Sequence, residues 1–178
     1  NLDIKNGEIE MSGLTERAGS AIWLNGSSEL TVESNATVAA VNNKMKSFAV
    51  SFDPSCEKSK LTLNGKIKGE SGVTINGKIA AEGNIVNINK DADIDVSDTG
   101  LYLAGVGNTT LSGAHIKGST AVEIRAGKMT INDGNYTATA ERFSCDPNGN
   151  GTTTDGAAVA IAQHTTKKDI SVTINGGT

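Results

Sequence analysis

The chain has few of the residues that hold small secreted domains together or fill the cores of compact folds. Its 178 residues include two cysteines, two prolines and only 3% aromatic residues. Two cysteines exclude a multi-disulfide framework. Because Cys56 and Cys145 lie far apart in the repeat described below, we expect two free thiols. With so few rings, the core must be built from Val, Ile, Leu and Ala.

Strong charge of one sign and long apolar runs are also missing. The net charge is -4 and no basic run occurs, which argues against nucleic acid or an anionic membrane surface as the partner. No apolar run reaches the length of about 18 residues that a membrane span needs. Residues 1–4 already alternate like a strand and do not read as a signal peptide. Since there are only two histidines, we expect neither a metal centre nor another cofactor.

A short phrase returns along the whole chain. It consists of an apolar residue, Thr, another apolar residue and a turn containing Asn or Gly. The clearest copies are residues 61–65 (LTLNG), 73–77 (VTING), 129–132 (MTIN) and 172–176 (VTING). Short strands that recur with turn residues between them are typical of solenoids built from stacked coils.

Aligning the copies predicts an all-β, three-sided parallel β-helix of about six coils, in which each coil of roughly 20 to 30 residues contributes three short strands. Alternation of period two then assigns one apolar column to the interior. Its members are Ile4, Val32, Leu63, Ile88, Leu111, Ile131 and Ile174. One register stays open, because residues 61–72 and 73–84 are near-copies and the second copy fits either of two sides.

The repeat predicts a single domain, residues 1–178, with one sizeable insertion. Residues 141–156 are rich in Gly, Asn and Thr and interrupt the repeat, so we expect them to form a surface loop. The sequence begins and stops within a period. We therefore expect a fragment of a longer repeat protein, with coils that pack end to end as the alternative.

These phrases resemble a known family. Residues 111–118 (LSGAHIKG) and 173–178 (TINGGT) are similar to the right-handed parallel β-helix repeats of the pectin-lyase-like superfamily, especially the Gly/Thr/Asn-rich forms in large secreted or surface proteins of bacteria. The resemblance implies the fold and a secreted or cell-surface location. It implies no single activity, since the same coils serve lyases, hydrolases, adhesins and tail spikes.

The densest acidic stretch, residues 91–98, is a candidate cation site. The predicted register instead places Asp93 between Lys66 and His115, and Asp95 between Lys68 and Lys117. Opposite charges on neighbouring strands stabilise a sheet, whereas flanking ammonium groups disfavour a bound cation. We therefore expect two rows of ion pairs here and no metal.

The outer face of the first strand of each coil is the strongest candidate binding surface. Exposed aromatic rings beside carboxylates and a guanidinium are suited to sugars, because a ring stacks on a pyranose while polar neighbours bind its hydroxyls. The candidate residues are Trp23, Asp53, Tyr102, Glu123 and Arg125. Two alternatives stay open: Trp23 lies under a loop or under an N-terminal capping element outside this sequence, or Glu123 and Arg125 form an ordinary surface pair. His164, in a polar turn, is expected to be exposed.

Three functions fit this reading. The favoured one is a non-catalytic adhesin-like module or structural stalk that contacts an extracellular polysaccharide or host glycan. The second is a polysaccharide lyase or glycoside hydrolase, for which Asp53, Glu123 and Arg125 are the available residues. The third is an ice-binding solenoid, suggested by one column of the second strands: Thr31, Thr62, Asn87, Thr110, Thr130 and Thr173.

Overall fold

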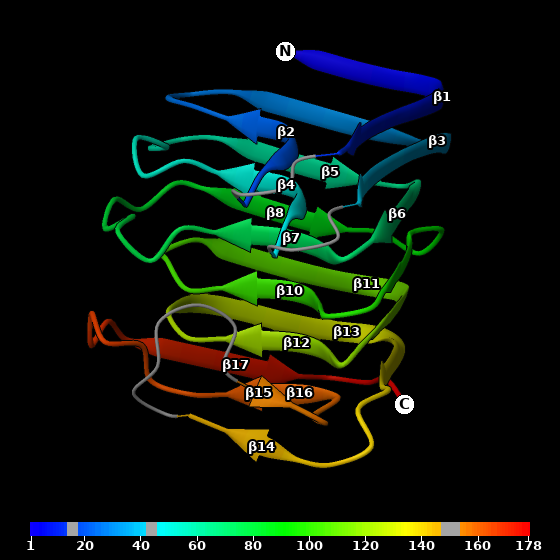
Figure 1. Cartoon of the computed structure of the whole chain (residues 1–178). Coiled ribbons are helices and arrows are strands. Elements are labelled where there is room, and N and C mark those ends of the chain that lie inside the picture. Colours follow the sequence, from blue (N-terminus) through cyan, green and yellow to red (C-terminus); the bar gives the residue numbers. More distant parts are fainter. Residues whose placement is uncertain (14–17, 42–45, 147–153) are drawn as a thin grey trace.

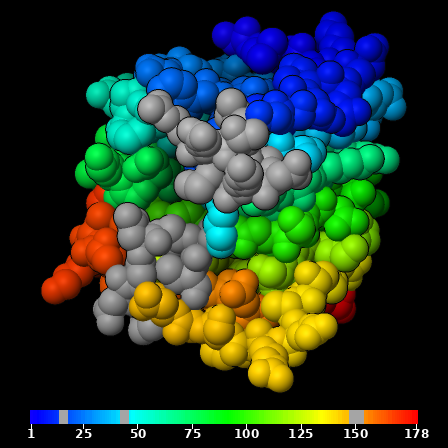
Figure 2. Space-filling view, in the orientation of Figure 1, coloured from blue at the N-terminus to red at the C-terminus, as the bar shows by residue number. Residues whose placement is uncertain are grey.

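The computed structural model describes residues 1–13, 18–41, 46–146 and 154–178. Within these residues the chain is all-β and contains no helix, and two large parallel sheets run along the molecule (Figure 1). Figure 2 shows blue N-terminal segments at the top, green ones below them and yellow ones at the bottom, with the orange to red C-terminal segment at the left beside the green. Strands in equivalent positions of successive repeats pair with one another. This arrangement is consistent with a β-solenoid.

One sheet has six parallel strands in the order β16-β12-β10-β7-β4-β2. The strands are β2 (Ser20–Leu24), β4 (Phe48–Phe52), β7 (Ser71–Ile75), β10 (Thr99–Leu103), β12 (Thr120–Ile124) and β16 (Val159–Ile161). They are the first strands of the predicted coils. The open register is thereby resolved, because β7 pairs with β4 and β10 whereas its near-copy at 61–63 lies in the other sheet.

The other sheet has nine strands. They are β1 (Leu2–Ser12), β3 (Glu29–Val41), β5 (Lys60–Leu63), β6 (Lys66–Gly69), β8 (Ile85–Ile88), β9 (Asp93–Val96), β11 (Asn108–Gly118), β13 (Gly127–Ala138) and β17 (Ile170–Ile174). The first part of β3 pairs with β5 and its second part with β6. A long strand here therefore spans what β5 and β6 contribute separately.

The long strands shift register where the two parts meet. In β11 the pairing with β13 slips on both sides of Ser112, next to Gly113, whose φ of +96° favours glycine. The irregularity re-aims the strand without ending it. β14 (Ser144–Cys145) and β15 (Thr154–Asp155) form a small antiparallel pair within the predicted insertion 141–156, of which residues 147–153 lie outside the described part.

The interior is aliphatic, as predicted. Each member of the predicted column pairs with the next, from Ile4 with Val32 to Ile131 with Ile174. Val32, Leu63 and Leu111 are fully buried, whereas Ile174, on the last strand, is exposed. Such stacking removes apolar surface from water at about 25 cal/mol per Å². The column is therefore one part of the apolar core that stabilises the fold.

The predicted charge rows also lie in register. Asp93 pairs with Lys66 and His115, and Asp95 pairs with Lys68 and Lys117. The Nζ of Lys117 lies 3.2 Å from a carboxylate oxygen of Asp95, and both side chains are about half exposed. A pair this exposed contributes at most about 1 kcal/mol. No cluster of three or more metal-binding side chains occurs among the described residues.

Two further expectations concern the cysteines and the membrane. Cys56 is buried, its thiol donating to the carbonyl of Leu24, and Cys145 is exposed; both are free, as predicted. Within the described ranges, no helix has the length and apolarity required to cross a bilayer.

Candidate binding groove

The row predicted on the outer face of the six-stranded sheet is present as a continuous set of strand pairings. Trp23 pairs with Ser51, Ser51 with Thr74 and Thr74 with Tyr102. The row then continues through Glu123 to Ala160. The sequence therefore predicted the register of this row correctly, but the two ends of the row differ sharply in exposure.

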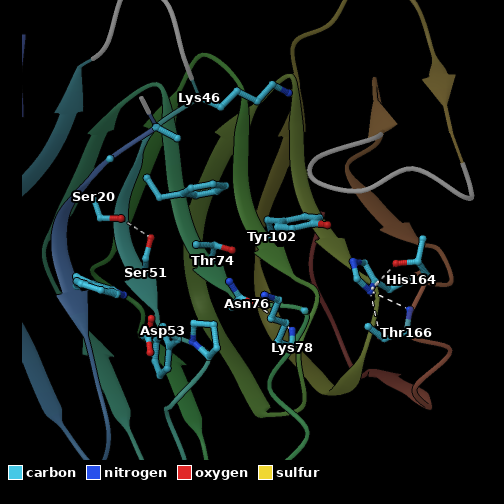
Figure 3. A pocket seen from close by; sticks show the side chains of 18 residues that line it. Ser20, Lys46, Ser51, Asp53, Thr74, Asn76, Lys78, Tyr102, His164 and Thr166 are labelled. Carbon is cyan, nitrogen blue, oxygen red and sulfur yellow. Dashed lines mark hydrogen bonds between the residues drawn. The ribbon is translucent and has the colours of Figure 1, made fainter. Parts of the chain in front are cut away.

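A groove of about 880 Å³ lies over the part of this face formed by β2, β4, β7 and β10. Its described lining comes from these strands, from residues just before β2 and β4, from the turns that follow β4 and β7, and from a segment near the C-terminus (Figure 3). The residues that matter most below are Trp23, Phe48, Ser51, Asp53, Thr74, Asn76, Lys78, Tyr102, His164 and Thr166.

Trp23 and Asp53 form one end of the groove. The indole is 65% exposed, so the open alternative that Trp23 lies under a loop is not what the described residues show. Asp53 accepts hydrogen bonds from the hydroxyl of Ser55 at 2.7 Å and from its backbone N–H at 2.9 Å. These bonds, with a smaller contribution from Trp23, lower the pKa of Asp53. A carboxylate that stays ionised thus borders a flat exposed ring.

Tyr102 lies further along the row and is almost buried. Its ring stacks on Phe48 with the centroids 6.4 Å apart and an interplanar angle of 25°. Only 6% of Tyr102 is exposed, so the prediction of an exposed tyrosine is wrong. Phe48 was not among the predicted groove residues, because alternation alone gives it the same parity as the buried Val50 and Phe52. Between the two aromatic ends, Ser51 and Thr74 supply hydroxyls, and Ser51 hydrogen-bonds Ser20 at 2.6 Å.

Glu123 and Arg125 do not reach the groove. Both side chains are fully buried, with the Nε of Arg125 3.9 Å from a carboxylate oxygen of Glu123. The hydroxyl of Thr154 donates to Glu123 at 3.2 Å, and the guanidinium donates to the carbonyl of Gln163 at 2.8 Å. The prediction that these two residues are exposed on the outer face is therefore wrong, because β15 and the segment after β16 cover them.

His164 was expected to be exposed, and this too is wrong. The side chain is 6% exposed and lines the groove. Its Nδ1 accepts the backbone N–H of Thr166 at 3.2 Å, which leaves the proton on Nε2 in the neutral ring. Burial, followed by the nearby Arg125 and Lys168, lowers the pKa of His164. No local signal marks the position, because its neighbour Gly77 lies far away in the sequence.

The Thr column of the ice-binding alternative is in register but adjoins a polar ladder. Asn64 donates to Glu33 at 3.0 Å and Asn89 donates to Asn64 at 2.7 Å. Asn175 donates to Asn132 at 2.9 Å in the same way. These side chains satisfy one another from coil to coil, and such ladders stabilise stacked strands. Their arrangement has a structural explanation that requires no ice.

Comparison with known proteins gives no further guide. No protein-family model, curated protein or solved structure matches the chain. The groove itself therefore carries the functional argument.

Proposed function

We propose that the chain is a three-sided parallel β-helix of about six coils, and that it acts as a non-catalytic, glycan-binding module of a secreted or cell-surface protein. The strand pairings support the division into coils, because each strand pairs with the equivalent strand of the next repeat. The resemblance of the repeats to pectin-lyase-like coils supports the location. A rigid rod that presents a groove on one side suits an adhesin-like module or stalk.

The observation that carries the binding proposal is the exposed indole of Trp23 at the mouth of a groove. A large ring left 65% exposed on a rigid sheet is costly to hydrate and offers a platform for the apolar face of a sugar ring. Asp53 beside it, and Ser51, Thr74 and Asn76 along the floor, provide acceptors and donors for hydroxyl groups. This combination favours a polysaccharide or host glycan over an apolar ligand.

The chemistry of the groove favours binding over cleavage. Glycoside hydrolysis normally needs two carboxyl groups facing one bond. Among the described residues that line the groove, Asp53 is the one carboxylate. The other residues considered for an enzyme, Glu123 and Arg125, are fully buried and hold each other and the neighbouring backbone. Asp53 alone is suited to orienting a hydroxyl.

A glycan array tests the proposal. Wild-type protein is expected to retain a defined set of glycans, and Trp23→Ala is expected to weaken their binding by about tenfold or more, as for a central aromatic contact. Phe143→Ala is the matched control, since Phe143 is 71% exposed but does not line the groove. Equal binding by wild type and Trp23→Ala would remove the proposed site. Release of unsaturated products from pectin-like polymers would instead support a lyase.

A further inference from the structure

The groove ends at a segment that crosses the outer face of the six-stranded sheet. We call residues 162–169, which connect β16 to β17, the clasp. Arg125 donates to the carbonyl of Gln163 at 2.8 Å, and the amide of Gln163 donates to the carbonyl of Lys168 at 2.8 Å. The Nζ of Lys168 in turn donates to the carbonyls of Gly77 and Ile79, at 2.8 Å for Gly77. The clasp is thus hydrogen-bonded to Arg125, just after β12, and to Gly77 and Ile79, just after β7.

The side chain of His164, in the clasp, lies against Gly77. A Cβ atom placed on Gly77 would lie only 2.6 Å from the Cε1 of His164, so the imidazole can take this position only because residue 77 has no side chain. The ring is nearly buried and is held by Thr166. The imidazole of His164 therefore forms a fixed wall of the groove. In Figure 3 His164 and Thr166 lie at one side of the groove and Ser20 at the other, with Ser51, Thr74 and Tyr102 between them.

The sheet face on the far side of this wall is covered. Glu123 on β12 is fully buried, and Ala160 on β16 is 8% exposed. Thr154 packs over Glu123 and is itself buried. At the other end of the row, Trp23 stands largely exposed on β2. Among the described residues, the clasp therefore closes the groove at one end, and Trp23 lies exposed at the other.

We infer that the groove receives the end of a glycan chain, and not an interior stretch of a polymer. This inference rests on the proposed function. Three strand spacings, about 14 Å in all, separate β2 from β10. That length holds a few terminal sugar units between Trp23 and His164. A chain that continued past Tyr102 would meet the clasp, so an interior segment has no path through the groove.

The stoichiometry of binding tests the inference. The probes are cello-, xylo-, malto- and chito-oligosaccharides, each compared as a hexamer and as a longer soluble chain by isothermal titration calorimetry. For a series that binds, an end-binding groove predicts one protein per chain at every length. A number of bound proteins that rises with chain length would overturn the inference alone. No binding to any series would contradict the proposed function, and the inference would fall with it.

Two variants that loosen the clasp sharpen the test. Gly77→Ala pushes His164 away, and Lys168→Ala removes the bonds to the carbonyls of Gly77 and Ile79. Both are expected to let longer chains pass and to raise the number of proteins bound per long chain. Lys5→Ala, which alters an exposed lysine on β1 outside both the clasp and the groove, is the control and should keep one protein per chain.

A ligand-free measurement shows whether the clasp has opened. The backbone N–H groups of Thr166 and Lys167 both bond to His164, and their hydrogen exchange should be about tenfold faster in the two variants. If exchange accelerates while binding stays at one protein per long chain, the clasp does not close the groove and the inference is wrong. If both change together, the inference holds.

Discussion

The two halves of one sheet face show how differently equivalent positions can behave. Trp23 on β2 and Glu123 on β12 belong to the same outward row, related by strand pairing alone. Trp23 is 65% exposed, whereas Glu123 is fully buried. The difference arises from β15 and the clasp, which return across β12 and leave β2 to β7 open. Alternation assigns a side chain to one face of a sheet but does not decide whether that face meets water.

Coverage also changes the energetic role of polar residues. On the open half, Ser51, Thr74 and Asp53 keep solvent as an alternative partner and remain available to a ligand. On the covered half, Glu123 and Arg125 have exchanged water for each other and for Thr154 and the backbone. Removing one member of such a pair leaves a charge buried without compensation. We therefore expect stability to reside in the covered half and binding in the open half.

The largest expected effect comes from breaking the covered pair. Arg125→Ala should lower the free energy of unfolding by about 3 to 5 kcal/mol, because Glu123 would stay buried without its partner. Urea unfolding measures the change. Thr74→Ala, on the open half of the same face, is the comparison and should cost less than about 1 kcal/mol.

A double variant separates the charge from the packing. Glu123→Gln combined with Arg125→Met removes both charges and keeps most of the volume, so it should recover a large part of the loss. If Arg125→Ala lowers the free energy of unfolding by less than about 1 kcal/mol, the covered half does not contribute more to stability than the open half.

Acid should weaken the covered half selectively. The fold lowers the pKa of His164, which Arg125 and Lys168 face, so the folded protein favours the neutral ring. As pH falls through the ordinary value of 6.5, the unfolded chain takes up the proton before the folded one does, and stability declines. We expect unfolding midpoints to be lower at pH 5 than at pH 7.5, and His164→Gln to show less of this decline. An identical pH dependence in the wild type and in His164→Gln would show that protonation of His164 does not cause the decline.

The smallest expected effect is on the stability of the open half. Trp23→Ala should change the free energy of unfolding by no more than about 0.5 kcal/mol, because the indole packs little and is largely exposed. Thermal unfolding, with the Phe143→Ala control alongside, measures the change. A loss above about 2 kcal/mol would make Trp23 a structural residue and would weaken its role as a binding platform.

The sequence predicted the register of the strands because the signal is local and repeated. Val32, Leu63 and Leu111 recur within similar phrases, and stacking requires such residues to coincide. The same reasoning placed Asp93 and Asp95 correctly in their charge rows.

The covering of the sheet face could not be predicted in this way. It depends on a bond from Lys168 to Gly77 across 91 positions and on one from Arg125 to Gln163 across 38. Neither contact belongs to the repeat, and both come from irregular segments whose paths alternation does not describe. Tyr102 and Glu123 were therefore placed in the correct row, and Arg125 beside it, but all three were given the wrong exposure.

The fluorescence of Trp23 tests the central claim most directly, because it is the only tryptophan in the chain. Acrylamide quenching would be measured on the free protein and in the presence of a saturating glycan retained on the array. We predict strong quenching of the free protein and clear protection when the sugar covers the indole. Equal quenching with and without the glycan, or a free protein whose indole is already shielded, would contradict a sugar-binding groove that opens at Trp23.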